Sequence, residues 1–239
     1  MNWDVDKTAL IELLGKTIYR PENVLVEIVA NSYDADASTV KIMSSGENEI
    51  VQILDDGCGM DEDDLKVLVT IAKSKKKELI NQKQLTPKFK RQYLGSFGIG
   101  IISFLSLGNK IKIFTKKKDG KTLFVEITRK IDEKTGKTID IPITSISSDA
   151  DYSIHLIEGG KTESGTTIEI ENTKLDFSSN FKLLKHKLSN LPLSSNFKTY
   201  LNNSEIAKED YPSNAWENKS FDIELIDIDP SYKSKVELH

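Results

Sequence analysis

The feature that most constrains the fold is a short apolar run that ends in two aspartates. Residues 50–54 are rich in β-branched side chains and carry apolar residues on both faces, which predicts a central strand covered on both sides. The run continues directly into Asp55-Asp56-Gly57-Cys58-Gly59-Met60. Ligands of open α/β sheets bind beyond the carboxyl ends of the strands, so Asp55 is a candidate ligand-binding group. The alternative interpretation is a tight turn that needs glycine and aspartate for its backbone conformation.

A second motif lies in a helix predicted over residues 22–35, with Pro21 at its start, where a missing N–H costs little. Within this helix Glu27, Asn31 and Asp34 are spaced by four and three and therefore line one face. A carboxylate, an amide and a second carboxylate in register could order a water molecule, a Mg²⁺ ion and a ligand. A solvated polar face is the alternative interpretation.

Two further glycine-containing motifs follow along the chain. Residues 95–100 (Gly-Ser-Phe-Gly-Ile-Gly) open a predicted apolar helix over 101–107. Backbone N–H groups at a glycine-rich helix start favour an anion such as phosphate. Gly165-Thr166-Thr167 enters a predicted strand and is a weaker signal. The tripeptide Gly-Lys-Thr occurs repeatedly, but the upstream glycine of the common phosphate loop is missing each time, which excludes that loop.

The order of predicted elements indicates the fold class and the domain organisation. Strands interspersed with helices imply an α/β sandwich with a mixed sheet. A helix is predicted to start at Asp61. Residues 73–94 are rich in lysine and contain Pro87, which predicts a long mobile insertion rather than a core element. Residues 204–239 are predicted to be a connector that leads into the start of a following domain.

Composition excludes several classes of function. The chain has 239 residues and a net charge of −4, which gives no support for a nucleic-acid or membrane surface. Its one cysteine excludes an internal disulfide framework and a cysteine-built metal site. No apolar run is long enough to span a bilayer, and the N-terminal residues lack the pattern of a signal peptide. A cytoplasmic location without membrane association is therefore expected.

Taken in this order, the motifs EIVANSYDADA, DDGCGM, GSFGIG and SGTT resemble those of the GHKL ATPases, or Bergerat-fold proteins. This superfamily includes DNA gyrase, heat-shock protein 90 chaperones, sensor kinases, MutL mismatch-repair proteins and MORC proteins. The resemblance covers residues 8–202 and implies a two-layer sandwich with a mixed, mostly antiparallel sheet covered by helices on one face. Residues 1–203 would then form an ATP-binding domain whose lid lies at about 61–94. Residues 70–74 are most similar to the start of the lid in heat-shock protein 90, whereas other motifs fit MORC and MutL equally well.

The resemblance also implies a role for individual residues. Glu27 looks like the general base that polarises the attacking water, and Asn31 looks like the Mg²⁺ ligand that bridges the metal to the phosphates. Asp34 looks like a supporting residue near the base and ribose. Asp55 resembles the aspartate that accepts the adenine amino hydrogen. Thr166 looks like the threonine that supports adenine recognition through the same aspartate and a water.

The remaining residues of the implied nucleotide site fall into three groups. Gly59 and Met60 are expected to shape the base pocket, with Gly57 in the same site. Lys73 is expected to reach the phosphates when the lid closes. The loop that cradles the triphosphate would consist of Gly95, Ser96, Phe97, Gly98, Ile99 and Gly100.

The function implied is an ATP-hydrolysing conformational switch that uses ATP and Mg²⁺, forms a nucleotide-dependent homodimer and acts on a protein client or a downstream domain. In dimeric relatives a following domain supplies a cation to the γ-phosphate, so slow hydrolysis is expected of this chain alone. A non-hydrolysing ATP-dependent clamp or sensor is the first alternative, and a protein kinase of the same fold is the second. The lysine-rich segment 73–91 fits a basic flap over ATP, a DNA-contacting patch or a solvated loop, so a nucleic-acid partner stays open.

Overall fold

The structure of the chain is a computed structural model in which the chain divides into two units. The described residues belong to Met1–Lys208, and the second unit, Glu209–His239, lies outside them, as does most of the predicted connector. The predicted helix over 101–107 is described only at Phe104 and Leu107. The structure describes residues 21–44, 50–68, 76–94, 104, 107–149, 155–157, 160–161, 163–173 and 175–207.

The described helices and strands follow one another as the sequence predicts in outline. The helices are α2 (Pro21–Asp34), α3 (Glu62–Leu68), α4 (Lys76–Asn81) and α6 (Phe177–Ser189). The strands are β1 (Thr39–Ser44), β2 (Ile50–Asp55), β3 (Lys110–Lys116), β4 (Thr122–Thr128), β5 (Lys130–Ile131), β6 (Thr138–Asp140), β7 (Ser147–Asp149), β8 (His155–Ile157), β9 (Gly160–Lys161), β10 (Gly165–Glu171), β11 (Lys198–Leu201) and β12 (Ser204–Glu205).

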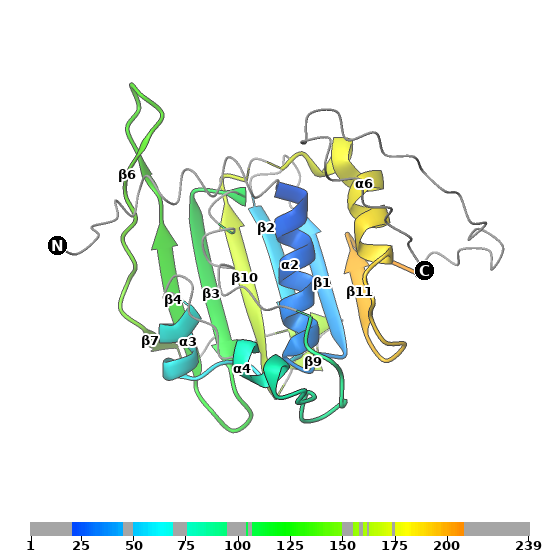
Figure 1. Ribbon diagram of the computed structural model, residues 1–239. Coiled ribbons are helices and arrows are strands. Elements are labelled where there is room, and N and C mark those ends of the chain that lie inside the picture. The colour runs from blue at the N-terminus through cyan, green and yellow to red at the C-terminus, as the bar shows by residue number, and fades with distance from the viewer. Residues whose placement is uncertain are drawn as a thin grey trace, which may run out of the picture. The chain divides into compact units, whose positions relative to one another are not determined.

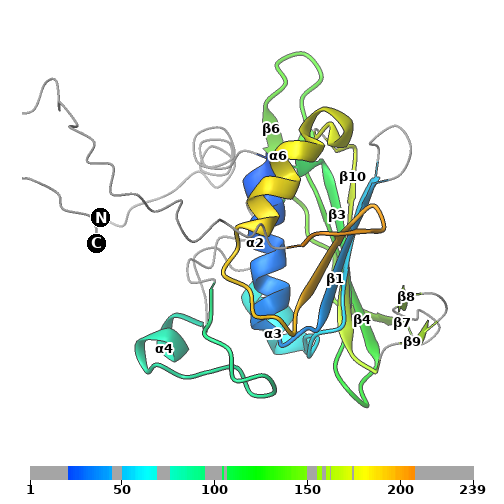
Figure 2. The ribbon, with the colours of Figure 1, turned by 90° about the vertical axis from the view of Figure 1, so that its right-hand side faces the viewer.

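The main sheet has eight strands in the order β12-β11-β1-β2-β10-β3-β4-β7 (Figure 1). Strands β1 and β11 pair in parallel, and the other neighbouring pairs are antiparallel. Helices α2, α3 and α6 lie on one side of this sheet, and the small β8–β9 sheet lies on the other (Figure 2). The predicted mixed, mostly antiparallel sheet with helices on one face is therefore confirmed.

The hydrophobic core lies between α2, α6 and the covered face of the sheet. Helix α2 contributes Val24, Leu25, Ile28 and Val29, all of which are fully or almost fully buried. These residues recur at the spacing of a single helix face. Alternate residues of the central strands face them, as expected for a sheet with one buried side. Burial of each such side chain stabilises the fold by about 1.5–3 kcal/mol.

The prediction that β2 is covered on both faces needs correction. Val51 and Ile53 are buried on the helical face, but Ile50, on the other face, is 38% exposed. Gln52 also lies on that face and donates to Glu169 of β10 at 2.8 Å. Leu54 is buried there, because β8 lies against this end of β2. Among the described residues, helices thus cover only one face of β2, and an apolar pattern alone could not reveal that Ile50 stands at the uncovered end of the strand.

Helix α3 starts where the sequence predicts. The Asp64 N–H donates to the Asp61 carboxylate at 2.8 Å, and the Asp61 N–H donates back to the Asp64 carboxylate at 3.3 Å. This reciprocal cap satisfies two N–H groups that the first turn leaves without helical partners. Lys117 pairs with both carboxylates, at 2.6 and 2.8 Å, and so ties the start of α3 to the turn between β3 and β4.

The prediction that residues 73–94 form a long mobile insertion rather than a core element needs correction in its C-terminal part. Thr86 is fully buried and Arg91 is 3% exposed, although Arg91 belongs to a strongly basic segment. Both side chains are held by hydrogen bonds. A count of lysines and arginines favours a solvated loop, because it cannot show that one of the cations is buried against backbone carbonyl groups.

Candidate functional site

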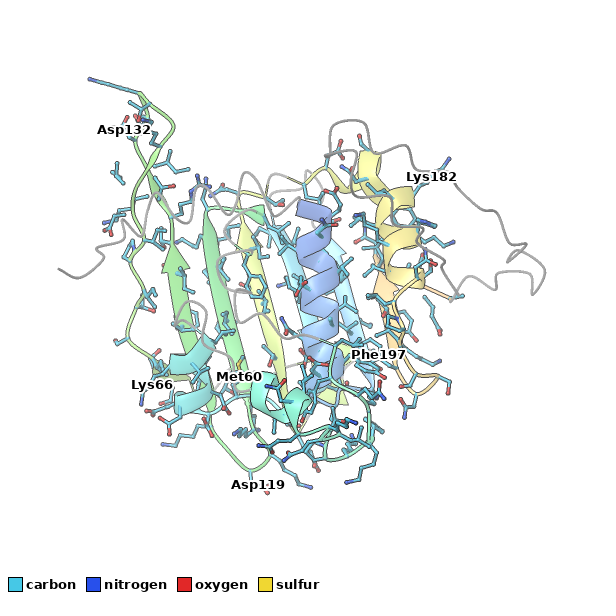
Figure 3. The ribbon with its side chains drawn as sticks, in the orientation of Figure 1. Met60, Lys66, Asp119, Asp132, Lys182 and Phe197 are labelled. Atoms are coloured by element: carbon cyan, nitrogen blue, oxygen red, sulfur yellow. The ribbon has the colours of Figure 1, made fainter. Side chains whose placement is uncertain are left out.

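The candidate site lies at the end of the sheet where β2 finishes and β10 begins. Asp55 and Thr166 are direct partners in the antiparallel register of these two strands. The C-terminal half of α2 packs over the same end, because Ser32 contacts Asp55. Figure 3 labels Met60 at this end, where the β3–β4 turn with Asp119 also lies; Asp132 marks the opposite end. Three of the sequence motifs therefore converge on one place.

Asp55 is a buried carboxylate that accepts hydrogen bonds from the Ser32 side chain and from the backbone of Gly57 and Thr166. The Ser32 hydroxyl donates to Oδ2 and the Gly57 N–H donates to Oδ1, each at 2.9 Å. Burial raises the pKa of Asp55 to about 6 from its ordinary value of 3.8, and the hydrogen bonds from Gly57 and Ser32 offset part of that rise. A carboxylate has about four acceptor positions, so this group retains capacity for a ligand donor. Buried carboxyl groups with a raised pKa are characteristic of functional sites.

The raised pKa of Asp55 predicts how stability changes with pH. The folded chain holds a proton on Asp55 up to about pH 6, whereas the unfolded chain releases it near its ordinary pKa, so the folded state binds more protons between these values. The free energy of unfolding should therefore fall by about 3 kcal/mol as pH rises from about 4 to 6, and Asp55 should add no further change above that. Urea denaturation of wild type and Asp55→Asn across this range measures the difference. Parallel curves would contradict the prediction.

The turn after Asp55 fits only small residues. A Cβ on Gly57 would lie 2.8 Å from the Ala35 carbonyl oxygen. Gly59 has a φ of +67°, and a Cβ there would lie 1.9 Å from the Lys116 carbonyl oxygen. The turn is thus enclosed between the end of α2 and β3. The tight-turn interpretation is therefore confirmed for these two glycines, and ligand binding by Asp55 stays a prediction.

Thr115 of β3 is a site residue that the sequence does not reveal. Its Oγ1 accepts the Met60 N–H at 2.9 Å and lies 3.0 Å from the Thr166 Oγ1. It also donates to the Gly165 carbonyl at 3.2 Å. The fully buried hydroxyl therefore ties the turn around Met60 to β10. No sequence signal identifies it, because threonine is a common strand residue and Thr115 lies in no motif.

Glu27, Asn31 and Asp34 lie along α2 as the spacing predicts. Glu27 and Asn31 are partly buried, and Asp34 is buried. The Asp34 carboxylate accepts the Leu94 N–H at 2.8 Å. Asp34 thus fixes the residue that directly precedes the glycine-rich segment, and a direct contact with a ligand stays a prediction.

A Mg²⁺ ion can be tested against the donor set of these residues. Within the described part of the chain, no three histidine, cysteine, aspartate or glutamate side chains are grouped so that they could hold a metal. Mg²⁺ commonly binds through one or two protein oxygens together with water and substrate phosphates. A single amide such as Asn31 fits that mode, whereas a dedicated protein cage does not fit this site.

Several predicted site residues lie outside the described part of the chain. Lys73 and the segment Gly95 to Gly100 are among them, so their contacts with a nucleotide stay predictions. Among the described residues, no helix combines the length and the apolar character needed to cross a membrane.

The sheet, its one helical face and the buried acid at the end of a central strand are those of the GHKL class of ATPase domains. Residues 19–166 match the family model described as histidine kinase-, DNA gyrase B-, and HSP90-like ATPase. The match spans more than half of the chain, and the chain belongs to this family.

The similar proteins include both chaperones and mismatch-repair proteins. The chaperone protein HtpG of Borreliella burgdorferi is 29% identical over 167 residues, which are 58% of this chain and 27% of HtpG. HtpG of Campylobacter jejuni is 25% identical over 204 residues, or 77% of this chain and 30% of HtpG. The mismatch repair protein MutL of Chlorobaculum tepidum is 46% identical over 57 residues, or 23% of this chain and 9% of MutL. The chain thus spans less than a third of the length of these relatives.

Proposed function

We propose that this chain binds and hydrolyses ATP at the end of the sheet where Asp55 lies. The observation that carries the proposal is the buried Asp55 carboxylate, held by Ser32 and Gly57 and still able to accept a hydrogen. The exocyclic amino group of adenine is a donor of the kind such a carboxylate accepts. Thr166 lies opposite Asp55 and would support adenine recognition through a water. Gly57, Gly59 and Met60 would form the wall of the base pocket.

The polar face of α2 would serve the triphosphate. Asn31 would hold Mg²⁺, which supplies charge neutralisation for the phosphates when it is bound. Glu27 lies one helical turn before Asn31, is partly open to solvent and would orient the attacking water and take its proton. Asp34 would act from the base and ribose side. Lys73 and residues 95–100 would contact the phosphates.

ATP binding would drive a conformational switch rather than a metabolic reaction. In this proposal the lid at about 61–94 closes over Mg-ATP, two copies associate, and hydrolysis releases them. The similarity to HtpG and to MutL supports a domain that works within a larger machine, on a protein client or a downstream domain. Turnover by this chain alone would be slow. We place the protein in the cytoplasm and assign it no membrane contact; the net charge gives a nucleic-acid partner no support.

Replacement of Glu27 by alanine tests hydrolysis separately from binding. Glu27→Ala should reduce ATP turnover by two to four orders of magnitude, since general base catalysis contributes about 10²–10⁴-fold. The affinity for Mg-ATP should change little, because the base acts on water rather than on the nucleotide. Phosphate release and calorimetric titration measure the two quantities.

The matched control is Glu133→Ala, which removes an exposed carboxylate from the β5–β6 turn at the far end of the sheet. It should change neither quantity. If the wild type binds ATP and Glu27→Ala leaves the function of the protein unchanged, the non-hydrolysing sensor is the favoured interpretation. Transfer of the γ-phosphate label to protein would instead favour the kinase alternative.

A further inference from the structure

Residues 85–92 form a closed loop beside the candidate site, called here the 85–92 loop. Leu85 and Gln92 pair as an isolated antiparallel bridge. Inside it, the Thr86 N–H donates to the Arg91 carbonyl at 2.9 Å, and the Arg91 N–H donates to the Thr86 hydroxyl at 3.0 Å. These bonds give the loop a defined shape of its own.

Asp36, two residues after the end of α2, attaches the 85–92 loop to that end of the helix. Its backbone has a φ of +58°, a left-handed conformation that aspartate tolerates better than most residues. The carboxylate is buried and accepts the Lys88 N–H at 2.7 Å and the Phe89 N–H at 3.1 Å. Two adjacent backbone N–H groups thus donate to one buried carboxylate, and the two bonds together attach the loop firmly.

Arg91 forms the second attachment, through hydrogen bonds to backbone carbonyls and an amide. Its Nη1 donates to the carbonyls of Ala37 at 2.6 Å and Tyr33 at 3.3 Å. Its Nη2 donates to the Asn196 side-chain oxygen at 2.7 Å and to the Asn196 carbonyl at 3.1 Å, and Nε also donates to that side chain. The guanidinium thus joins the end of α2 to the segment before β11. A cation at a helix C-terminus also complements the helix dipole.

Three aromatic rings enclose the Arg91 guanidinium. Its central carbon lies 4.2 Å from the ring centroid of Phe89, 4.5 Å from that of Tyr33 and 5.4 Å from that of Phe197. Cation–π attraction in such a buried setting adds to the hydrogen bonds. A lysine could not replace this arrangement, because its single ammonium lacks the planar fork that reaches several carbonyls at once.

These contacts lie immediately before the segment that would hold the phosphates. Arg91 is three residues before Leu94, whose N–H rests on Asp34. The chain that enters Gly95 is therefore fixed at Asp36, at Arg91 and again at Asp34. We propose that Arg91 and Asp36 are positioning residues: they hold the 85–92 loop, and with it Leu94, against α2, next to the polar face of that helix that would serve the triphosphate of the bound nucleotide. This inference rests on the proposed function.

The test compares two ligands that differ in their phosphates. Adenosine reports on the base pocket alone, and Mg-ATP reports on the base pocket and the phosphate contacts together. Arg91→Ala should weaken Mg-ATP binding by about tenfold or more, because the loss of one hydrogen bond to a charged group such as a phosphate is enough for a change of that size. Its adenosine affinity should stay within about twofold of wild type, because Asp55 and its partners are untouched. Calorimetric titration of both ligands gives the ratio of affinities.

Two further variants separate geometry from charge and from folding. Arg91→Lys keeps the positive charge but loses the fork, so it should show the same selective loss as Arg91→Ala. Gln92→Ala changes an exposed neighbour and should behave as wild type. Asp36→Ala removes the other attachment and should weaken Mg-ATP selectively as well, which keeps the test decisive if Arg91→Ala fails to fold.

The outcomes distinguish this inference from the proposed function. If wild type binds neither ligand, the proposed function fails. If wild type binds both and the Arg91 and Asp36 variants keep the wild-type ratio, the positioning role is wrong while the proposed function stands. An equal loss of both ligands in folded variants would also overturn the inference, since it would show a general structural role.

Discussion

Replacement of Asp55 by asparagine is expected to weaken Mg-ATP binding by one to two orders of magnitude without lowering stability at neutral pH. The loss follows because a hydrogen bond to a charged acceptor is worth about 1.5–3 kcal/mol. Stability should not fall, because the carboxylate that predominates at pH 7 carries the cost of burial that raises the pKa of Asp55 to about 6, and a neutral amide does not carry that cost. Calorimetric titration and urea denaturation of the same two samples measure both effects.

Asp56, the neighbouring carboxylate, serves as a control, because its replacement is expected to lower stability and not Mg-ATP affinity. Asp56 accepts the N–H groups of Ser38 and Thr39 at 2.7 and 2.8 Å and also bonds to the Ser38 hydroxyl. It secures the start of β1 and has no proposed contact with the nucleotide. Asp56→Asn should therefore lower stability and leave Mg-ATP affinity unchanged. If Asp55→Asn retained wild-type affinity, Asp55 would not be the acceptor for the adenine amino group, even if ATP bound elsewhere.

Local patterns predicted the parts of this fold that depend on neighbours in sequence. The strand predicted to begin at Gly165 and the start of α3 at Asp61 agree with the structure, because alternation and capping are local signals. The helical face of Glu27, Asn31 and Asp34 was also predictable, since helical spacing determines it. The convergence of the motifs was implied only by their resemblance, in order, to a known family.

Contacts between distant backbone groups could not be predicted in this way. Arg91 looked like one more solvated cation of a basic segment, but its partners are carbonyl oxygens of Tyr33, Ala37 and Asn196. Every residue has a backbone carbonyl, so the sequence does not show which of them accepts a hydrogen bond from Arg91. Thr115 could not be predicted for a similar reason, because its partner, the Met60 N–H, lies 55 positions away in the sequence. Candidate binding residues can thus be identified from sequence motifs, whereas a buried residue such as Thr115, which contacts them, cannot.

Gly59→Ala is expected to lower the free energy of unfolding more than Gly136→Ala does. Gly59 and Gly136 have nearly the same backbone conformation, with φ values of +67° and +66°. An L-residue in this left-handed region costs roughly 1–2 kcal/mol at either position. The two differ in their surroundings, since a Cβ on Gly136 meets nothing within 4 Å, whereas a Cβ on Gly59 would overlap the Lys116 carbonyl.

The difference between the two variants therefore isolates the close approach of the Gly59 turn to β3. Gly59→Ala should cost about 1–3 kcal/mol more than Gly136→Ala, the usual penalty for an added methyl group in a packed region. It should also weaken Mg-ATP binding, because relief of the overlap displaces the hydrogen bond from Met60 to Thr115. Gly136→Ala should leave binding unchanged. If urea denaturation shows equal losses of stability for the two variants, the turn can move away from β3 at little cost. Glycine would then be required at position 59 for its backbone conformation and not for its contact with β3.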